Sequence, residues 1–67
     1  MDLMKYLNKK AGSEIKVHTL TGETYRGILV GFDVYVNMKM KDCRINEGDS
    51  LEWVVVNGMQ VVYVDLD

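Results

Sequence analysis

The sequence has only one cysteine and one histidine, which excludes two common ways of stabilising a small protein. Cys43 alone forms no intramolecular disulfide, and its spacing from His18 matches no zinc site. A 67-residue chain buries only ~60% of its unfolded surface. Small domains usually compensate with disulfides, metals or oligomerisation, so we expect this chain to oligomerise. A well-packed monomer is the alternative, because many domains of about 60 residues fold alone.

Long apolar runs and low-complexity segments are also missing. No run approaches the ~18 residues of a membrane span, and lysines interrupt the N-terminal segment where a signal peptide would be apolar. Together with the lone thiol, this predicts a cytoplasmic protein without a membrane segment. Proline and internal repeats are absent, whereas 48% of the residues are hydrophobic. We therefore expect one folded domain over residues 1–67.

Residues that carry chemistry are equally scarce. The sequence has no Ser/His/Asp or Cys/His arrangement, no glycine-rich phosphate loop and no cluster of metal-ligating residues. We therefore expect a protein that is not an enzyme and that holds neither a metal nor a cofactor.

Positive charge is limited but unevenly distributed. The net charge is −2, yet residues 1–41 carry +3 and residues 42–67 carry −5. Nucleic-acid-binding domains usually show a basic patch, so the overall charge argues mildly against one. The net charge of +3 over residues 1–41 leaves a local basic patch as the alternative. Lys9, Lys10 and Lys16 are expected to be solvated, with contact to nucleic-acid phosphates as the alternative.

The N-terminal segment has the periodicity of a helix. Over residues 2–11, Leu3 and Leu7 lie one turn apart on one face. Asp2 complements the positive end of the helix dipole, and Gly12 is a plausible stop. A helix this short is marginal alone, so we expect it to pack against the rest of the chain.

After Gly12 the period changes to two, which is typical of strands. Gly27 and Gly31 lie inside the second expected strand and indicate bending or close backbone approach. Asn57-Gly58 has the composition of a two-residue hairpin turn, and we expect His18 to be an exposed strand residue. Strands are predicted over 14–20, 24–32, 36–45, 51–56 and 59–64. The predicted fold class is therefore mainly β, a short helix followed by a strongly bent five-stranded antiparallel small barrel of the SH3/OB type.

The last two expected strands are unusually apolar. Continuous apolar runs indicate burial on both faces, which a five-stranded barrel cannot provide internally. An exposed apolar edge favours pairing with another chain. We therefore predict that these strands form a subunit interface, with the N-terminal helix covering their outer face as the alternative. The predicted interface residues are Trp53, Val54, Val55, Val56, Val61, Val62, Tyr63 and Val64.

Two motifs give the chain a resemblance to a known family. The first spans 15–43 and centres on Gly31-Phe32-Asp33, followed by Asn37. The second spans 51–64, with Asn57-Gly58 between two valine-rich stretches. On these motifs the chain resembles the Sm-like (LSm) family, as a single-domain homomeric member of archaeal, bacterial or viral type.

The resemblance implies a fold, an assembly and a ligand. Members carry an N-terminal helix on a bent five-stranded barrel. They form rings, here a hexamer or heptamer, by pairing the fourth strand of one subunit with the fifth of the next. The rings bind single-stranded, U-rich RNA near the pore as non-catalytic scaffolds or chaperones.

The resemblance also implies roles for individual residues. Tyr35 matches the position that stacks on a base, Asn37 the residue that bonds the base edge, and Asp33 the acid that orients Asn37. Gly58 permits close backbone approach in the second loop. Asn57 stands where the family usually has an arginine that sandwiches the base and adds positive charge.

Each of these residues also has a structural interpretation. Tyr35 could pack on a neighbour, Asn37 could bind only local backbone, and Asn57 with Gly58 could simply form a type I′ turn. The loss of the arginine favours an alternative function, a ring that acts as a protein-interaction scaffold with weak or no RNA binding. A monomeric SH3-like adaptor for peptides is a third hypothesis.

Overall fold

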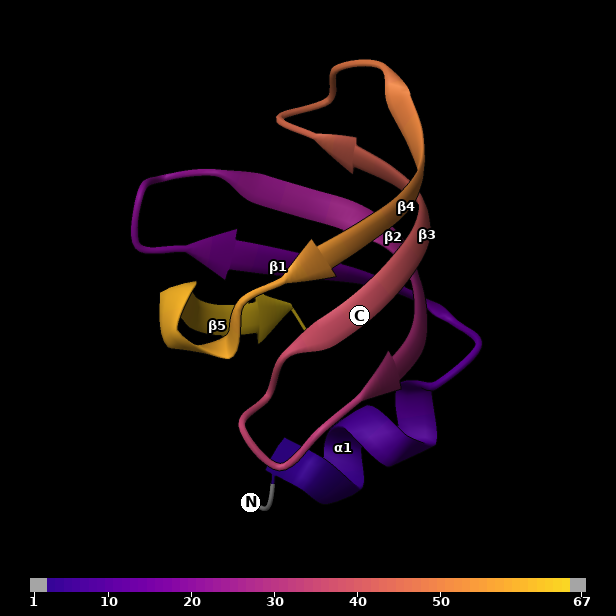
Figure 1. Ribbon diagram of the computed structural model, residues 1–67, viewed down its shortest axis with the longest axis vertical. Coiled ribbons are helices and arrows are strands. Elements are labelled where there is room, and N and C mark those ends of the chain that lie inside the picture. The colour runs from indigo at the N-terminus through magenta and orange to yellow at the C-terminus, as the bar shows by residue number, and fades with distance from the viewer. Residues whose placement is uncertain (1–2, 66–67) are drawn as a thin grey trace.

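A computed structural model describes residues 3–65 and shows one helix followed by five antiparallel strands (Figure 1). This confirms the predicted fold class. No helix within residues 3–65 is long and apolar enough to cross a membrane. The elements are α1 (Leu3–Lys10), β1 (Glu14–Thr19), β2 (Thr24–Phe32), β3 (Met38–Ile45), β4 (Ser50–Val56), the 3₁₀ helix η1 (Gly58–Gln60) and β5 (Val61–Asp65).

The helix α1 lies within the predicted range and packs through one face. Leu7 is fully buried in the core, as its position on the apolar face predicts. Lys9 and Lys10 occupy the last turn, where cations complement the negative end of the helix dipole. Gly12 follows with a φ of 87°, a left-handed conformation typical of a residue that ends a helix. Asp2 lies outside the described residues.

The strands form one sheet in the order β4-β3-β2-β1-β5, with every neighbouring pair antiparallel. The strands β4 and β5 follow each other in the sequence but lie at opposite edges of the sheet. The sheet curls strongly, so that the short segment after β4 leads directly into β5 (Figure 1). Two edges therefore keep unpaired backbone groups within the described part of the chain.

The predicted hairpin turn at Asn57-Gly58 is wrong. A type I′ turn needs a positive φ at both central residues, whereas Asn57 is extended at φ −70° and ψ 124°. The Asn57 side-chain oxygen accepts the Met59 N–H and caps η1. Because η1 occupies residues 58–60, β5 begins at Val61 rather than at residue 59.

Gly27 marks the point where β2 bends against β3. A Cβ at Gly27 would lie 2.8 Å from the Cys43 Cα, so no side chain fits there without movement. The β2–β3 register shifts between Arg26 and Ile28, as a β-bulge does when it bends a strand. Gly31 differs, because nothing lies within 4 Å of a Cβ at that position. Close backbone approach is therefore confirmed at Gly27, whereas at Gly31 the register shift between Leu29 and Gly31 supports the other alternative, bending.

The core is small and lies inside the curled sheet, closed at one end by α1. Alternate residues of β1 face inward, as the period of two predicts. In β3 the alternation breaks at Asp42, which has a φ of 49°, so the inward residues are Met38, Met40 and Cys43. The thiol of Cys43 is a core group, and burial raises its pKa, so it stays neutral. The buried hydrophobic residues are Leu7, Ile15, Val17, Leu29, Met38, Met40, Cys43 and Val56.

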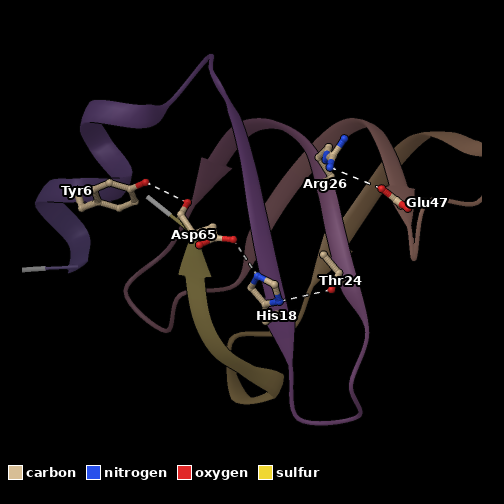
Figure 2. Close-up of polar contacts among 6 residues, drawn as sticks. All are labelled: Tyr6, His18, Thr24, Arg26, Glu47 and Asp65. Carbon is tan, nitrogen blue, oxygen red and sulfur yellow. Dashed lines mark hydrogen bonds and ion pairs between the residues drawn. The ribbon is translucent and has the colours of Figure 1, made fainter. Parts of the chain in front are cut away.

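His18 is not the exposed strand residue that we expected. Its side chain is only 20% exposed and its ring stacks on Tyr63, with centroids 4.1 Å apart. The two ring nitrogens lie 3.2 Å from Asp65 Oδ2 and 3.4 Å from Thr24 Oγ1 (Figure 2). The Tyr6 hydroxyl donates to the Asp65 carbonyl oxygen. These contacts tie the end of β5 to β1, β2 and α1, which the sequence pattern did not indicate.

Within one chain, the apolar strands β4 and β5 are largely uncovered. Val56 is buried, but Val55 is 72% exposed and Val62 and Tyr63 are 53% and 54% exposed. The alternative in which α1 covers these residues is therefore wrong. Trp53 is half exposed, and the Lys39 ammonium lies 4.7 Å from its ring centroid. The outer side of these two edges is left as an open apolar surface.

The close approach at Gly27 generates a stability prediction. Gly27→Ala should lower the free energy of unfolding by about 1–3 kcal/mol, because the added methyl group overpacks against Cys43. Gly31→Ala is the matched control on the same strand. It should leave stability unchanged or raise it by up to about 1 kcal/mol, because it meets no atom and restricts the unfolded chain. Urea unfolding of both variants checks this, and equal losses would contradict it.

Candidate nucleic-acid interface

Two loops meet at one end of the sheet, the segment 33–37 after β2 and the segment 57–60 after β4. The sequence predicts that the third strand begins at residue 36, but β3 begins at Met38. Val36 has a φ of 63°, a left-handed conformation outside the extended region of a regular strand. The reason is Asp33, whose side chain competes for the backbone N–H groups that a strand would use.

Asp33 organises the first loop. Its Oδ1 accepts the N–H groups of Tyr35 at 2.8 Å and of Asn37 at 3.1 Å, while its Oδ2 accepts the Asn37 side-chain N–H at 3.0 Å. The Asn37 side chain, followed by the two backbone N–H groups, holds the pKa of the Asp33 carboxyl below its ordinary value. Asp33 is therefore an ionised group that fixes the Asn37 side chain, the geometry that the resemblance implies.

Asn37 joins the two loops. Its Oδ1 accepts the Gly58 N–H at 2.7 Å, so one carboxamide contacts both loops at once. A Cβ at Gly58 would overlap the Tyr35 carbonyl oxygen and lie 2.8 Å from the Val36 carbonyl carbon. Only glycine allows the backbones to come this close. Sequence reasoning missed this bond, because 21 positions separate the two residues and no local pattern links them.

Tyr35 stands at the tip of the first loop. Its side chain is 76% exposed, as is that of its neighbour Val34. The alternative in which Tyr35 packs on a neighbouring residue is therefore wrong within residues 3–65. Its backbone is held by Asp33 while its ring remains available for stacking.

Asn57 lies beside this cluster but outside its hydrogen-bond network. Its Oδ1 accepts the Met59 N–H at 3.0 Å, which leaves its side-chain N–H groups without a partner among the described residues. Asn37 likewise keeps one N–H after donating to Asp33. The loops thus present one open aromatic face and a few amide donors, groups that suit a flat ring bearing carbonyl oxygens.

Comparison with known proteins places this geometry among related structures. A family model described as the LSM domain matches residues 5–66. An SmAP (LSm) protein from Methanococcus vannielii superposes with a TM-score of 0.91 at 26% identity, covering 98% of this chain and 96% of that one. No curated protein matches the sequence.

Two further structures show the same fold. The SmAP1 heptamer of Pyrobaculum aerophilum gives a TM-score of 0.88 at 25% identity, covering 97% of this chain and 92% of that one. The Sm protein of Pyrococcus abyssii in complex with a uridine heptamer superposes with a TM-score of 0.88 at 18% identity, covering 96% of each chain. At that identity, the likeness to the second protein shows the fold alone.

The lowered pKa of Asp33 gives a pH prediction. Because the folded pKa lies below the unfolded value of about 3.9, the stabilisation from Asp33 is complete above roughly pH 4 and is lost as the pH falls through the folded pKa. A carbon-13 titration of the carboxyl group checks this. Asn37→Ala should bring the Asp33 pKa closer to its ordinary value, whereas Val34→Ala should leave it unchanged. A shift of equal size in both variants would contradict the assignment.

Proposed function

The chain belongs to the LSM domain family, and on that premise we propose that it binds single-stranded, U-rich RNA through the loops 33–37 and 57–60. The observation that carries this proposal is the bridge from Asp33 through Asn37 to Gly58, which holds an exposed Tyr35 beside both loops. The uridine heptamer bound to the Pyrococcus abyssii Sm protein supports the choice of ligand.

Each residue of the loops takes a distinct role in the proposed complex. Tyr35 stacks on a base, an interaction worth about 1–3 kcal/mol per base. Asn37 donates its remaining N–H to a base carbonyl and is oriented by Asp33. Gly58 allows the second loop to approach, and Asn57 contributes its side-chain N–H groups as donors in place of the arginine that the family usually has.

We also propose that the protein works as a homomeric ring, a hexamer or heptamer. Support comes from the edge strands, because β4 and β5 both keep unpaired backbone and an exposed apolar side within the described chain. Pairing β4 of one subunit with β5 of the next would complete both edges, with residues 53–56 and 61–64 at the contact. The heptamer of Pyrobaculum aerophilum supports this assembly.

The proposed role is non-catalytic, that of a scaffold or chaperone for RNA. A cytoplasmic location stays a prediction, supported by the single unpaired thiol of Cys43, which suits a reducing compartment. That one domain spans residues 1–67 also stays a prediction, since the family model matches 5–66.

A second candidate function is a ring that binds proteins and has little affinity for RNA. The observation that favours it is Asn57, which has no charge and whose side-chain oxygen is already bonded to Met59. Such a ring would keep the β4–β5 assembly and lose the response to RNA, so RNA binding separates the two functions.

RNA binding gives the first functional prediction. Tyr35→Ala should weaken the binding of a uridine heptamer by at least about tenfold, because one stacked base is worth about 1–3 kcal/mol, each 1.4 kcal/mol is tenfold, and every subunit of the proposed ring loses its stack. Fluorescence anisotropy at low salt measures the affinity. Val34→Ala is the matched control, since Val34 is equally exposed in the same loop. If both variants bind alike, the stacking role is refuted. If the unaltered protein fails to bind, the protein scaffold is favoured.

Ring assembly gives a second prediction. Val62→Lys should reduce the mass measured by light scattering from that of a ring toward the 7.7 kDa of one chain, because a lysine on an edge strand opposes pairing. Val30→Lys is the control, since Val30 is also partly exposed but lies on β2, which is paired on both sides. A ring that persists in the first variant, or dissociates equally in both, would contradict the edge assignment.

A further inference from the structure

Three basic residues lie in one row across the outer side of the sheet. Lys16 of β1 is the direct cross-strand partner of Arg26 on β2, and Arg26 is the direct partner of Arg44 on β3. Residues that pair directly point to the same side of a sheet. Ile15 and Val17, which flank Lys16, are buried, so the row faces away from the core.

The row is only partly neutralised by acidic neighbours. Glu47 lies 3.7 Å from one Arg26 nitrogen and is itself highly exposed. Asp65 is the cross-strand partner of Lys16, but its carboxylate contacts His18 (Figure 2). No ion pair involves Lys16 or Arg44 within the described residues. The row therefore keeps a local excess of positive charge in a protein whose net charge is −2.

Folding alone does not account for this arrangement. Like charges directly opposite on neighbouring strands are destabilising, and Arg26 faces Arg44 in this way. Such departures from the ordinary rules of stability are found mainly at functional sites. A bound anion would turn the repulsion between Arg26 and Arg44 into a net attraction, because each cation would then face a negative group.

The row also borders a hollow in the surface. Its volume is about 150 Å³, and it is lined by Lys16, Thr24, Arg26, Arg44 and Glu47. The lining offers three cationic groups against one carboxylate, that of Glu47, and one hydroxyl, which also contacts His18. Guanidinium groups match the oxygen geometry of a phosphate, and lysine adds a point charge. We propose that Lys16, Arg26 and Arg44 bind phosphate groups of an RNA strand, as a site separate from the two loops.

This site lies at the other end of β2 from Tyr35. Seven positions separate Arg26 from Asp33, a reach of at most about 23 Å along an extended strand. An RNA held at the loops would have to extend beyond them to reach the basic row. The inference rests on the proposed function for the identity of the nucleic acid. It places positive charge at a second site, since Asn57 brings no charge to the loops.

Arg44→Glu tests the site without threatening the fold. A glutamate at that position would oppose Arg26 and replace a like-charge pair with an opposite-charge pair, so the thermal midpoint should stay the same or rise. Binding of an oligouridine of about 30 nucleotides, longer than the ~4–16 that one small barrel occupies, should weaken several-fold. The slope of log affinity against log salt should become shallower by about 0.7 for each phosphate that the variant no longer binds. Binding of the uridine heptamer should be unchanged.

Lys41→Glu is the control, since it makes the same change of charge on the outer side of β3 away from the hollow. The proposal is overturned if Arg44→Glu leaves the long RNA unaffected, weakens both lengths by the same factor, or acts no more strongly than Lys41→Glu. Arg44→Gln should show the same length dependence with a smaller loss of affinity. A failure of the loop site would appear separately, as heptamer binding that is absent or does not respond to Tyr35→Ala.

Discussion

The hydrogen bond from the Gly58 N–H to Asn37 Oδ1 is the contact on which the arrangement of this small protein depends. It holds the segment after β4 against the loop after β2, at the point where the chain crosses from one edge of the sheet to the other. Since Gly58 has no Cβ, the backbones meet closely enough for the bond to form. Asp33 orients the same carboxamide through its Nδ2, so one side chain sets the position of both loops.

That crossing has a consequence for the whole sheet. Because β4 and β5 do not pair with each other, each leaves an open edge, and their outer residues are exposed. The core is limited to a few side chains within the curl of the sheet. Burial on a neighbouring subunit would cover this apolar surface, which α1 leaves exposed within one chain. The bond that joins the loops thus lies between the two edges that the proposed ring uses.

The fold brings together basic residues that the sequence keeps apart. Lys16, Arg26 and Arg44 are far apart in the sequence, and the last of them belongs to the acidic part of the chain. Register places them side by side on β1, β2 and β3, opposite the face that packs on the core. An overall charge of −2 is therefore compatible with a local basic surface, because charge acts over a Debye length of about 8–10 Å rather than over a whole protein.

The sequence by itself determined the class of fold, most strand positions, the inward-facing residues of β1 and those of the first part of β3, because a period of two is a local property. It also singled out Asp33, Asn37 and Gly58, through a resemblance rather than through physical derivation. Only the tertiary structure decided that Asn57 and Gly58 lead into a 3₁₀ helix, that His18 stacks on Tyr63, and that Val36 is left-handed. The stacking of His18 depends on a partner 45 positions away, which no local pattern encodes. The conformations after Asp33 and Asn57 arise from side chains that bond backbone N–H groups two to four residues on, and the hydrophobic period does not report that competition. The shortage of cysteine and histidine excluded disulfide and zinc stabilisation from the start, but the order of the strands decided which surfaces stay open.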